Sequence, residues 1–125
     1  AEVFAMDIST EALNIAKQNA ENLNASVTFI EQNILSTKQL DSYDIIISNP
    51  PYVRNLEKAE ISENVLQHEP HLALFVDDND PLIFYRKITQ LAQKSLTENG
   101  LLFFEINQYL GNEMHEMVSE DFKTI

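Results

Sequence analysis

The sequence predicts an α/β protein built on a mostly parallel, doubly wound sheet. Three observations predict it: short apolar strands alternate with amphipathic helices, the run Ile45–Ile47 is β-branched at every residue, and Asp80-Pro81 marks a helix start. A continuous β-branched run suits a strand that a parallel sheet buries on both faces. The expected order is strand, helix, strand, strand, helix, strand, helix.

The composition fits one folded domain at most. The chain has 125 residues, 44% of them hydrophobic, and no apolar run approaches the roughly 20 residues of a membrane span. Its 20 acidic and 8 basic residues give a formal net charge of −12, and the Lys and Arg residues are scattered, which disfavours binding to naked DNA or RNA. The absence of cysteine excludes a disulfide framework and a thiolate zinc site, and it fits a cytoplasmic setting.

The first half of the chain predicts a strand, a helix and two further strands. Glu2–Met6 is a short buried strand that ends at Asp7, and Ser9 is the expected N-cap of a helix that runs to about Asn24. The apolar residues of this helix recur at helical spacing: Ala12, Ile15, Ala16, Ala20 and Leu23. The next predicted strands are Val27–Ile30 and Tyr43–Ser48.

The second half predicts a helix, a strand and a helix after a long segment of weak periodicity, Tyr52–Asp80. Asp80 is the expected N-cap and Pro81 the first helical residue. Asn99-Gly100 is expected to end this helix in a left-handed conformation. The buried stripe of the helix is expected to comprise Leu82, Tyr85, Ile88, Ala92 and Leu96. The remaining predicted elements are a strand at Leu101–Ile106, a helix at Gln108–Ser119 and the start of a strand at Phe122–Ile125.

The most informative stretch is Asp44–Tyr52, in which an apolar run ends at Ser48 and is followed by Asn-Pro-Pro-Tyr. Neither Pro50 nor Pro51 can donate a ladder hydrogen bond, and each biases the residue before it toward an extended conformation, so the strand must stop at Asn49. The result is a stiff loop at the carboxyl edge of a strand, where open α/β sheets place their ligands. The alternative is a rigid loop exit with no further role.

Asp7 ends the first predicted strand at the position where nucleotide-binding α/β folds place an acid. A carboxylate can accept hydrogen bonds from both hydroxyls of a ribose, so Asp7 is a candidate for cofactor binding. Its alternative role is to cap the following helix. The chain contains two glycines, and none forms the Gly-rich turn that nucleotide-binding α/β folds carry after their first strand.

Ser-Asn-Pro-Pro-Tyr at residues 48–52 resembles the signature of S-adenosylmethionine-dependent methyltransferases that modify a planar, amide-like nitrogen. Glu-Pro-His-Leu-Ala-Leu-Phe at residues 69–75 resembles the release factor glutamine methyltransferases of that group more than the adenine-methylating enzymes. The stretches Asp80–Arg86 and Gly100–Ile106 also look like that family, as does Gln108 shortly after Glu105. The resemblance covers essentially the whole chain.

This resemblance implies a Rossmann-like class I methyltransferase sheet, entered here at its second strand. The first strand, its Gly-rich loop and the following helix would precede Ala1, which makes residues 1–125 an internal piece of a catalytic domain. In the usual order of the fold, that strand lies between the strands at Glu2–Met6 and Tyr43–Ser48. Two sheet edges then lack partners, so we expect the isolated chain to be unstable or to self-associate.

The resemblance also implies the reaction: a methyl group passes from S-adenosyl-L-methionine to the side-chain amide nitrogen of the Gln in the Gly-Gly-Gln motif of peptide chain release factors. The cofactor-binding residues would be Asp7, Ile8, Asn33, Ile34 and Asn49. The catalytic residues would be Asn49, Pro50, Pro51 and Tyr52, and Glu69 would join Asn49, Pro50 and Tyr52 in binding the substrate. Asn33 stands where the family commonly has Asp, and a simple turn residue is its alternative role.

Orientation would be the basis of this catalysis. An amide nitrogen is a poor nucleophile because its lone pair is delocalised into the carbonyl group. The Asn49 side-chain oxygen and the Pro50 carbonyl could accept from its two N–H bonds, and Tyr52 could stack on the planar group. Glu105 is expected either to hold the loop that carries Asn49 or to face solvent at a strand end.

Other functions remain open at this stage. An N6-adenine methyltransferase uses the same Asn-Pro-Pro-Tyr logic, although the stretch at residues 69–74 and the few basic residues speak against it. The chain could also be a non-catalytic piece, and a dinucleotide-dependent dehydrogenase would share Asp7 but give no reason for Asn-Pro-Pro-Tyr. No metal site is predicted, because Asp-Asp-Asn-Asp at residues 77–80 lacks the glycine and the distal Glu of a Ca²⁺ loop.

Overall fold

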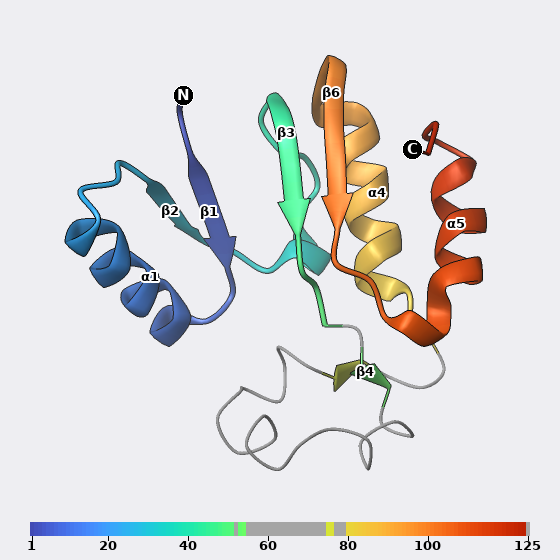
Figure 1. The fold of residues 1–125 in the computed structure, drawn as a ribbon, viewed down its shortest axis with the longest axis horizontal. Helices are drawn as coiled ribbons and strands as arrows, with labels where there is room; N and C mark the ends of the chain where they lie inside the picture. Colours follow the sequence, from blue (N-terminus) through green and yellow to red (C-terminus); the bar gives the residue numbers. More distant parts are fainter. Residues whose placement is uncertain (52, 55–74, 77–79, 125) are drawn as a thin grey trace. The chain divides into compact units, whose positions relative to one another are not determined.

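The computed structural model describes residues 1–51, 53–54, 75–76 and 80–124. The chain forms two compact units, Ala1–Thr37 and Lys38–Ile125, and the predicted alternation of strands and helices is confirmed (Figure 1). Among the described residues the strands pair two by two, β1 with β2, β3 with β6 and β4 with β5, and every pair is parallel. No helix of the described part has both the length and the apolar character that crossing a membrane requires.

The first unit is a strand–helix–strand arrangement. Strand β1 (Phe4–Asp7) pairs with β2 (Thr28–Glu31), and helix α1 (Thr10–Asn22) connects them. The prediction that Ser9 caps this helix is confirmed, because its hydroxyl accepts from the Ala12 N–H at 3.1 Å. The helix stops two residues before the predicted end because Asn24 adopts a positive φ of 53°, a conformation outside the helical region.

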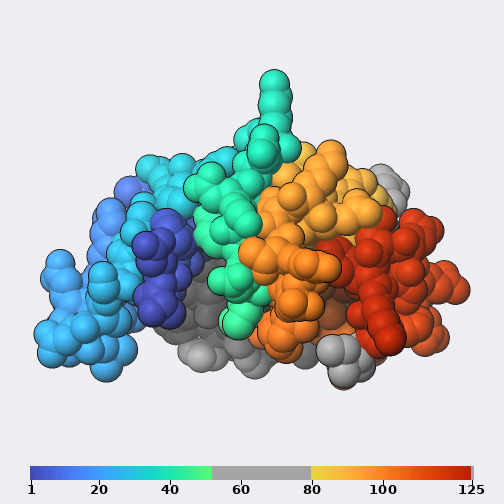
Figure 2. All heavy atoms as spheres, turned by 90° about the horizontal axis from the view of Figure 1, so that it is seen from above, coloured from blue at the N-terminus to red at the C-terminus, as the bar shows by residue number. Residues whose placement is uncertain are grey.

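In the second unit one helix packs on a parallel strand pair, and a second helix packs on the first. Strand β3 (Tyr43–Ser48) has the predicted bounds and pairs with β6 (Leu96–Phe104). Helix α4 (Ile83–Ser95) packs on β6, and α5 (Gly111–Ser119) packs on α4 after a 3₁₀ turn η3 (Gln108–Leu110). Figure 2 shows the red atoms of α5 lying against the orange atoms of this part of the chain. Among its described residues, the buried apolar side chains of the helices and of η3 are Tyr85, Ile88, Leu91, Ala92, Leu110 and Met114.

The predicted start of α4 is wrong by two residues. The helix begins at Ile83, and Leu82 occupies the N-cap position without a side-chain hydrogen bond. The Asp80 carboxylate instead accepts two hydrogen bonds from Arg86, at 3.0 and 3.1 Å. The Asp80 carbonyl accepts from the Ile83 N–H at 3.3 Å, so residues 80–83 form a turn ahead of the helix.

The predicted left-handed stop at Asn99-Gly100 is also wrong. Helix α4 ends at Ser95, both residues lie within β6, and Gly100 has no positive φ. The β3–β6 register is irregular here, with Tyr43 opposite Leu96 but Ile45 opposite Leu101. A Cβ at residue 100 would lie 2.9 Å from the Thr97 carbonyl oxygen and 3.1 Å from that of Asp44. Close backbone approach, rather than a left-handed φ, therefore requires glycine.

The ends of two other predicted strands differ from the structure. Strand β6 begins at Leu96 rather than Leu101 and ends at Phe104 rather than Ile106. Phe122–Thr124 forms no strand, and Ile125 lies outside the described residues. Two short strands, β4 (Val53–Arg54) and β5 (Phe75–Val76), pair in parallel within the long segment predicted to be weakly periodic.

One face of the β3–β6 pair is apolar and exposed. Its residues are Ile45 (56% exposed), Ile47 (78%), Leu101 (42%) and Phe103 (51%). On the opposite face, the Phe104 ring packs edge-on against Tyr85 of α4. Parallel sheets ordinarily bury both faces, so the exposed face is available for further packing.

The two glycines give a matched test of the close approach at the β3–β6 irregularity. Gly100→Ala should lower the free energy of unfolding by about 1–3 kcal/mol, because the nearest atom to the new methyl group is a backbone oxygen. Gly111→Ala should raise it by up to about 1 kcal/mol, because Gly111 is helical and its Cβ would meet nothing within 4 Å. Denaturant unfolding measures both values, and equal effects of the two substitutions would contradict this account.

Candidate functional site

The first candidate site is the carboxyl edge of the β1–β2 pair, within the first unit. Asp7 is the last residue of β1 and lies opposite Glu31, the last residue of β2. The Asp7 carboxylate is exposed, and its Oδ1 accepts from the Ser9 N–H at 2.8 Å. The Asp7 carbonyl accepts from the Gln32 N–H at 3.0 Å, which ties the two strand ends together. Asp7 thus contributes to the turn before α1, its alternative role, while its carboxylate remains exposed at the sheet edge.

Asn33 follows β2 and caps the 3₁₀ turn η1 (Ile34–Ser36). Its Oδ1 accepts from the Leu35 N–H at 3.0 Å, and its carbonyl accepts from the Thr37 hydroxyl at 2.9 Å. The alternative role of Asn33 as a turn residue is therefore present in the structure. Ile34 is half-buried beside it, and Ile8 is 51% exposed just after β1.

This edge of the first unit therefore combines an exposed acid with apolar side chains. Thr10 donates a hydrogen bond to the second acid of the edge, Glu31, which fixes that carboxylate toward the start of α1. A carboxylate oxygen has more than one acceptor site, so Asp7 can hold the Ser9 N–H and still accept from a hydroxyl group. The arrangement suits a ligand that carries hydroxyl groups and a flat apolar surface.

The second candidate site lies in the second unit, where β3 ends. Asn49 comes directly after Ser48 and is exposed, whereas Pro50 is buried and Pro51 is half-buried. The two prolines fix the backbone that leaves the strand, and the exposed carboxamide of Asn49 precedes them. Tyr52 and Glu69, also predicted as site residues, lie outside the described residues.

Two backbone contacts hold this strand end in place. The Glu105 N–H donates to the Ser48 carbonyl at 3.0 Å, and the Tyr85 hydroxyl donates to the Glu105 carbonyl at 2.7 Å. Of the two expectations for Glu105, its backbone N–H holds the end of β3, and the residue is also exposed just after β6, as the second expectation states. The sequence predicts that Tyr85 lies in the buried stripe of α4, but it does not predict the hydrogen bond of its hydroxyl. Tyrosine rather than phenylalanine at a buried position is the signal, because a buried hydroxyl requires a partner.

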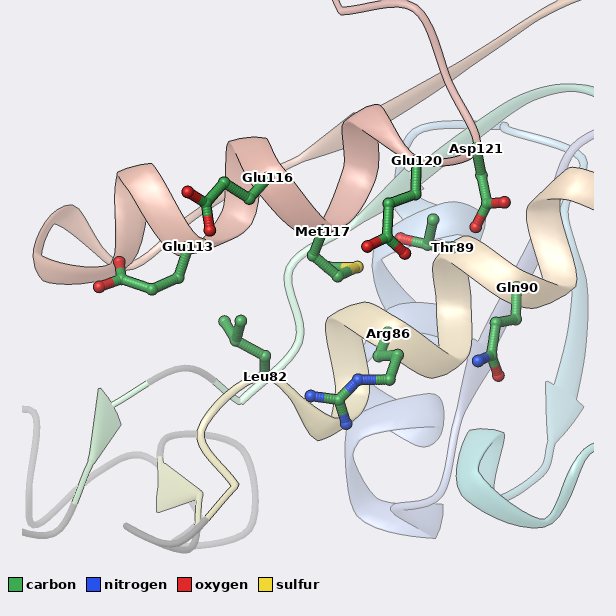
Figure 3. Close-up of a pocket in the computed structure, with 9 residues that line it drawn as sticks. All are labelled: Leu82, Arg86, Thr89, Gln90, Glu113, Glu116, Met117, Glu120 and Asp121. Carbon is green, nitrogen blue, oxygen red and sulfur yellow. The ribbon is translucent and has the colours of Figure 1, made fainter.

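A third feature is an open groove of about 380 Å³ between α4 and α5. Figure 3 shows acidic side chains from α5 and its C-terminal end on one side and Arg86 and Gln90 of α4 on the other. Hydrogen bonding to Asp80 raises the pKa of the Arg86 guanidinium above its ordinary value. This ion pair is half exposed, so its contribution to stability is small. None of the predicted site residues lines the groove.

Metal binding receives no support from the part of the chain that the structure describes. Within it, no group of three or more His, Cys, Asp or Glu side chains could hold a metal ion. Among the described residues, the predicted site residues lie at two places, the acidic edge in the first unit and the corner at Asn49 in the second.

Comparisons with known proteins identify the family. The family model of the methyltransferase small domain matches residues 1–73. A protein of Flavobacterium psychrophilum named release factor glutamine methyltransferase is 60% identical over 121 residues, which cover 96% of this chain and 42% of that protein. A protein of the same name from Bacteroides thetaiotaomicron is 53% identical over 120 residues, or 94% of this chain and 43% of that protein.

A solved structure supports the fold. The crystal structure of an S-adenosylmethionine-dependent methyltransferase from Clostridium acetobutylicum matches 88% of this chain and 35% of that one, with a TM-score of 0.53 and 19% identity. The predicted α/β class with parallel strands is confirmed by this likeness. The chain spans less than half the length of the curated relatives it matches. Since the family model covers more than half of its residues, the chain belongs to the methyltransferase small domain family.

Proposed function

We propose that this chain is part of the catalytic domain of a release factor glutamine methyltransferase. The reaction would transfer a methyl group from S-adenosyl-L-methionine to the side-chain amide of the Gln in the Gly-Gly-Gln motif of peptide chain release factors. The observation that carries the proposal is the exposed Asn49 after β3, in a chain that is 60% identical to a protein of that name. Translation termination in the cytoplasm is the setting that such a substrate implies.

The role of Asn49 follows from the chemistry of an amide. The amide nitrogen of the substrate Gln becomes nucleophilic only when both of its N–H bonds are held so that its lone pair faces the methyl donor. The Asn49 side-chain oxygen and the Pro50 carbonyl are acceptors of the required kind on neighbouring residues. These two acceptors would be preorganised, because the prolines at positions 50 and 51 restrict the backbone that carries them. Tyr52 and Glu69 complete the proposed substrate-binding set.

The proposed cofactor residues lie in the first unit. The exposed carboxylate of Asp7 suits the ribose hydroxyls, and Ile8 and Ile34 offer apolar surface beside it. Asn33 retains acceptor capacity on Oδ1 after capping η1, since an amide oxygen has two lone pairs. S-adenosyl-L-methionine, when bound, supplies a sulfonium that makes the methyl group reactive. The residues of this chain would hold and orient the cofactor.

The remainder of the activity belongs to the longer protein. The chain covers 42% and 43% of the two relatives named above, and the apolar face formed by Ile45, Ile47, Leu101 and Phe103 is exposed. We infer that residues 1–125 are one piece of a larger domain that completes the sheet and covers this face. The net charge of −12 favours a protein substrate over a nucleic acid, which makes adenine methylation the alternative to be tested.

Methylation of a release factor tests the proposal directly. The full-length protein with S-adenosyl-L-methionine should add one methyl group to the Gly-Gly-Gln peptide of a purified release factor, as measured by mass spectrometry. Asn49→Ala should slow the transfer by about 100-fold or more, because it removes an acceptor that orients the nitrogen. Asn112→Ala, at an exposed position on α5, is the matched control and should leave the rate unchanged.

Two outcomes would count against this function. If the release factor were not methylated and an adenine in DNA or RNA were, the substrate would be a nucleic acid rather than a release factor. Equal rates for the Asn49→Ala and Asn112→Ala proteins would remove Asn49 from the mechanism.

Cofactor binding by Asp7 is tested separately. Asp7→Asn keeps an oxygen for the Ser9 N–H but loses the negative charge, so the affinity for S-adenosyl-L-methionine should fall by about 10-fold to 100-fold. Glu21→Gln, an exposed acid on α1, should bind the cofactor like the unaltered protein. Isothermal titration calorimetry on the full-length proteins gives the dissociation constants. An unchanged affinity in Asp7→Asn would exclude Asp7 as a ligand of the ribose.

A further inference from the structure

The β3–β6 ladder ends at a point where one backbone carbonyl loses its ordinary partner. Ser48 lies opposite Phe104, and the Ser48 carbonyl accepts from the Glu105 N–H at 3.0 Å. In a parallel ladder the next bond would run from the N–H of residue 50 to the Glu105 carbonyl. Residue 50 is proline and has no N–H, so this bond cannot form.

The Tyr85 hydroxyl supplies the missing donor. It donates to the Glu105 carbonyl at 2.7 Å, a short and well-formed hydrogen bond. Tyr85 belongs to α4 and is fully buried, so its hydroxyl is held by the core rather than by solvent. Its ring also meets the Phe104 ring edge-on, with centroids 5.1 Å apart and an interplanar angle of 81°. One side chain therefore contacts both Phe104 and Glu105, the residues opposite the end of β3.

We propose that Tyr85 is a positioning residue that fixes the corner formed by Asn49 and Pro50. Its hydroxyl replaces the ladder donor that Pro50 lacks and holds Glu105, whose N–H in turn holds the carbonyl of Ser48. The proposal rests on the proposed role of Asn49 in orienting an amide. Tyr85 acts through the backbone and touches neither substrate nor cofactor in this role.

The geometry explains why such an anchor matters. Ser48 is joined directly to Asn49, so a shift of the Glu105 segment moves the residue that must aim the acceptor oxygen. Catalysis by orientation is sensitive to displacements of about 1 Å, which can reduce the rate by about 100-fold. Without the hydroxyl, the Glu105 carbonyl would lose this 2.7 Å hydrogen bond, and the segment would be held less firmly against α4.

Tyr85→Phe in the full-length protein tests the proposal. The substitution keeps the ring packing and removes only the hydroxyl. We expect kcat for methyl transfer to fall by about 10-fold to 100-fold, with the KM for the release factor and the affinity for S-adenosyl-L-methionine unchanged. Hydrogen exchange at the Glu105 amide should also become faster, because the bond to the Ser48 carbonyl loses its support.

Thr89→Val is the matched control. Thr89 is another buried hydroxyl-bearing residue of α4, 1% exposed, and it donates at 2.7 Å to the Tyr85 carbonyl within the helix. Its loss leaves no unsatisfied carbonyl, because a helix carbonyl also accepts from the backbone four residues on. We expect this variant to keep its kcat and the protection of the Glu105 amide.

The outcomes separate this inference from the proposed function. A kcat that falls in Tyr85→Phe alone, together with faster exchange at Glu105, supports the inference. Equal kcat values for Tyr85→Phe and Thr89→Val, or unchanged exchange at Glu105, would overturn it while leaving the function intact. If Asn49→Ala retained full activity, the proposed function of Asn49 would fail, and with it the catalytic role of Tyr85, even if the exchange at Glu105 still responded.

Discussion

The absence of an N–H group at Pro50 is the constraint on which the second candidate site depends. It ends the β3–β6 ladder at Ser48 and leaves Asn49 exposed just after the strand. It also deprives the Glu105 carbonyl of a strand partner, which the Tyr85 hydroxyl replaces. The same residue therefore terminates the strand, presents the carboxamide and creates the need for an anchor.

Tyr85 connects this corner to the core of the second unit. The hydrogen bond from its hydroxyl to the Glu105 carbonyl contributes about 1 kcal/mol to stability. Ile88 and Ala92, one and two turns further along α4, are buried on the same stripe. The apolar packing that stabilises α4 thus also determines where the hydroxyl lies. Core packing therefore sets the position of the end of β3. Because Asn49 follows that end directly, it can be held precisely enough for catalysis by orientation.

Local chemistry made part of this structure predictable. The bounds of β3 and the Ser9 cap follow from residues adjacent in sequence, and both predictions are confirmed. The predicted roles of Asp80 and Gly100 are wrong because distant groups compete for them: Arg86 takes the Asp80 carboxylate, and an irregularity against β3 crowds Gly100. For the candidate sites, the sequence predicts that Asp7 and Asn49 stand at strand ends, and the structure confirms both positions. The bond from Tyr85 to Glu105 spans 20 residues, and no local pattern predicts it.

The exposed apolar face of the β3–β6 pair indicates that further packing would complete the proposed site. Ile45 and Ile47 face away from the helix-covered side together with Leu101 and Phe103, although parallel sheets ordinarily bury both faces. Burying these side chains would stabilise the fold, because burial of apolar surface contributes about 25 cal/mol per Å² to the free energy of folding. The relatives are more than twice as long as the part this chain covers, so a longer protein of the proposed kind would have the material to bury this face. Because Ile47 directly precedes Ser48, the last residue of β3, covering it would restrict the strand end on the side that α4 does not reach. The proposed catalytic corner would then be held from both faces of the sheet, by Tyr85 on one and by the remainder of the protein on the other.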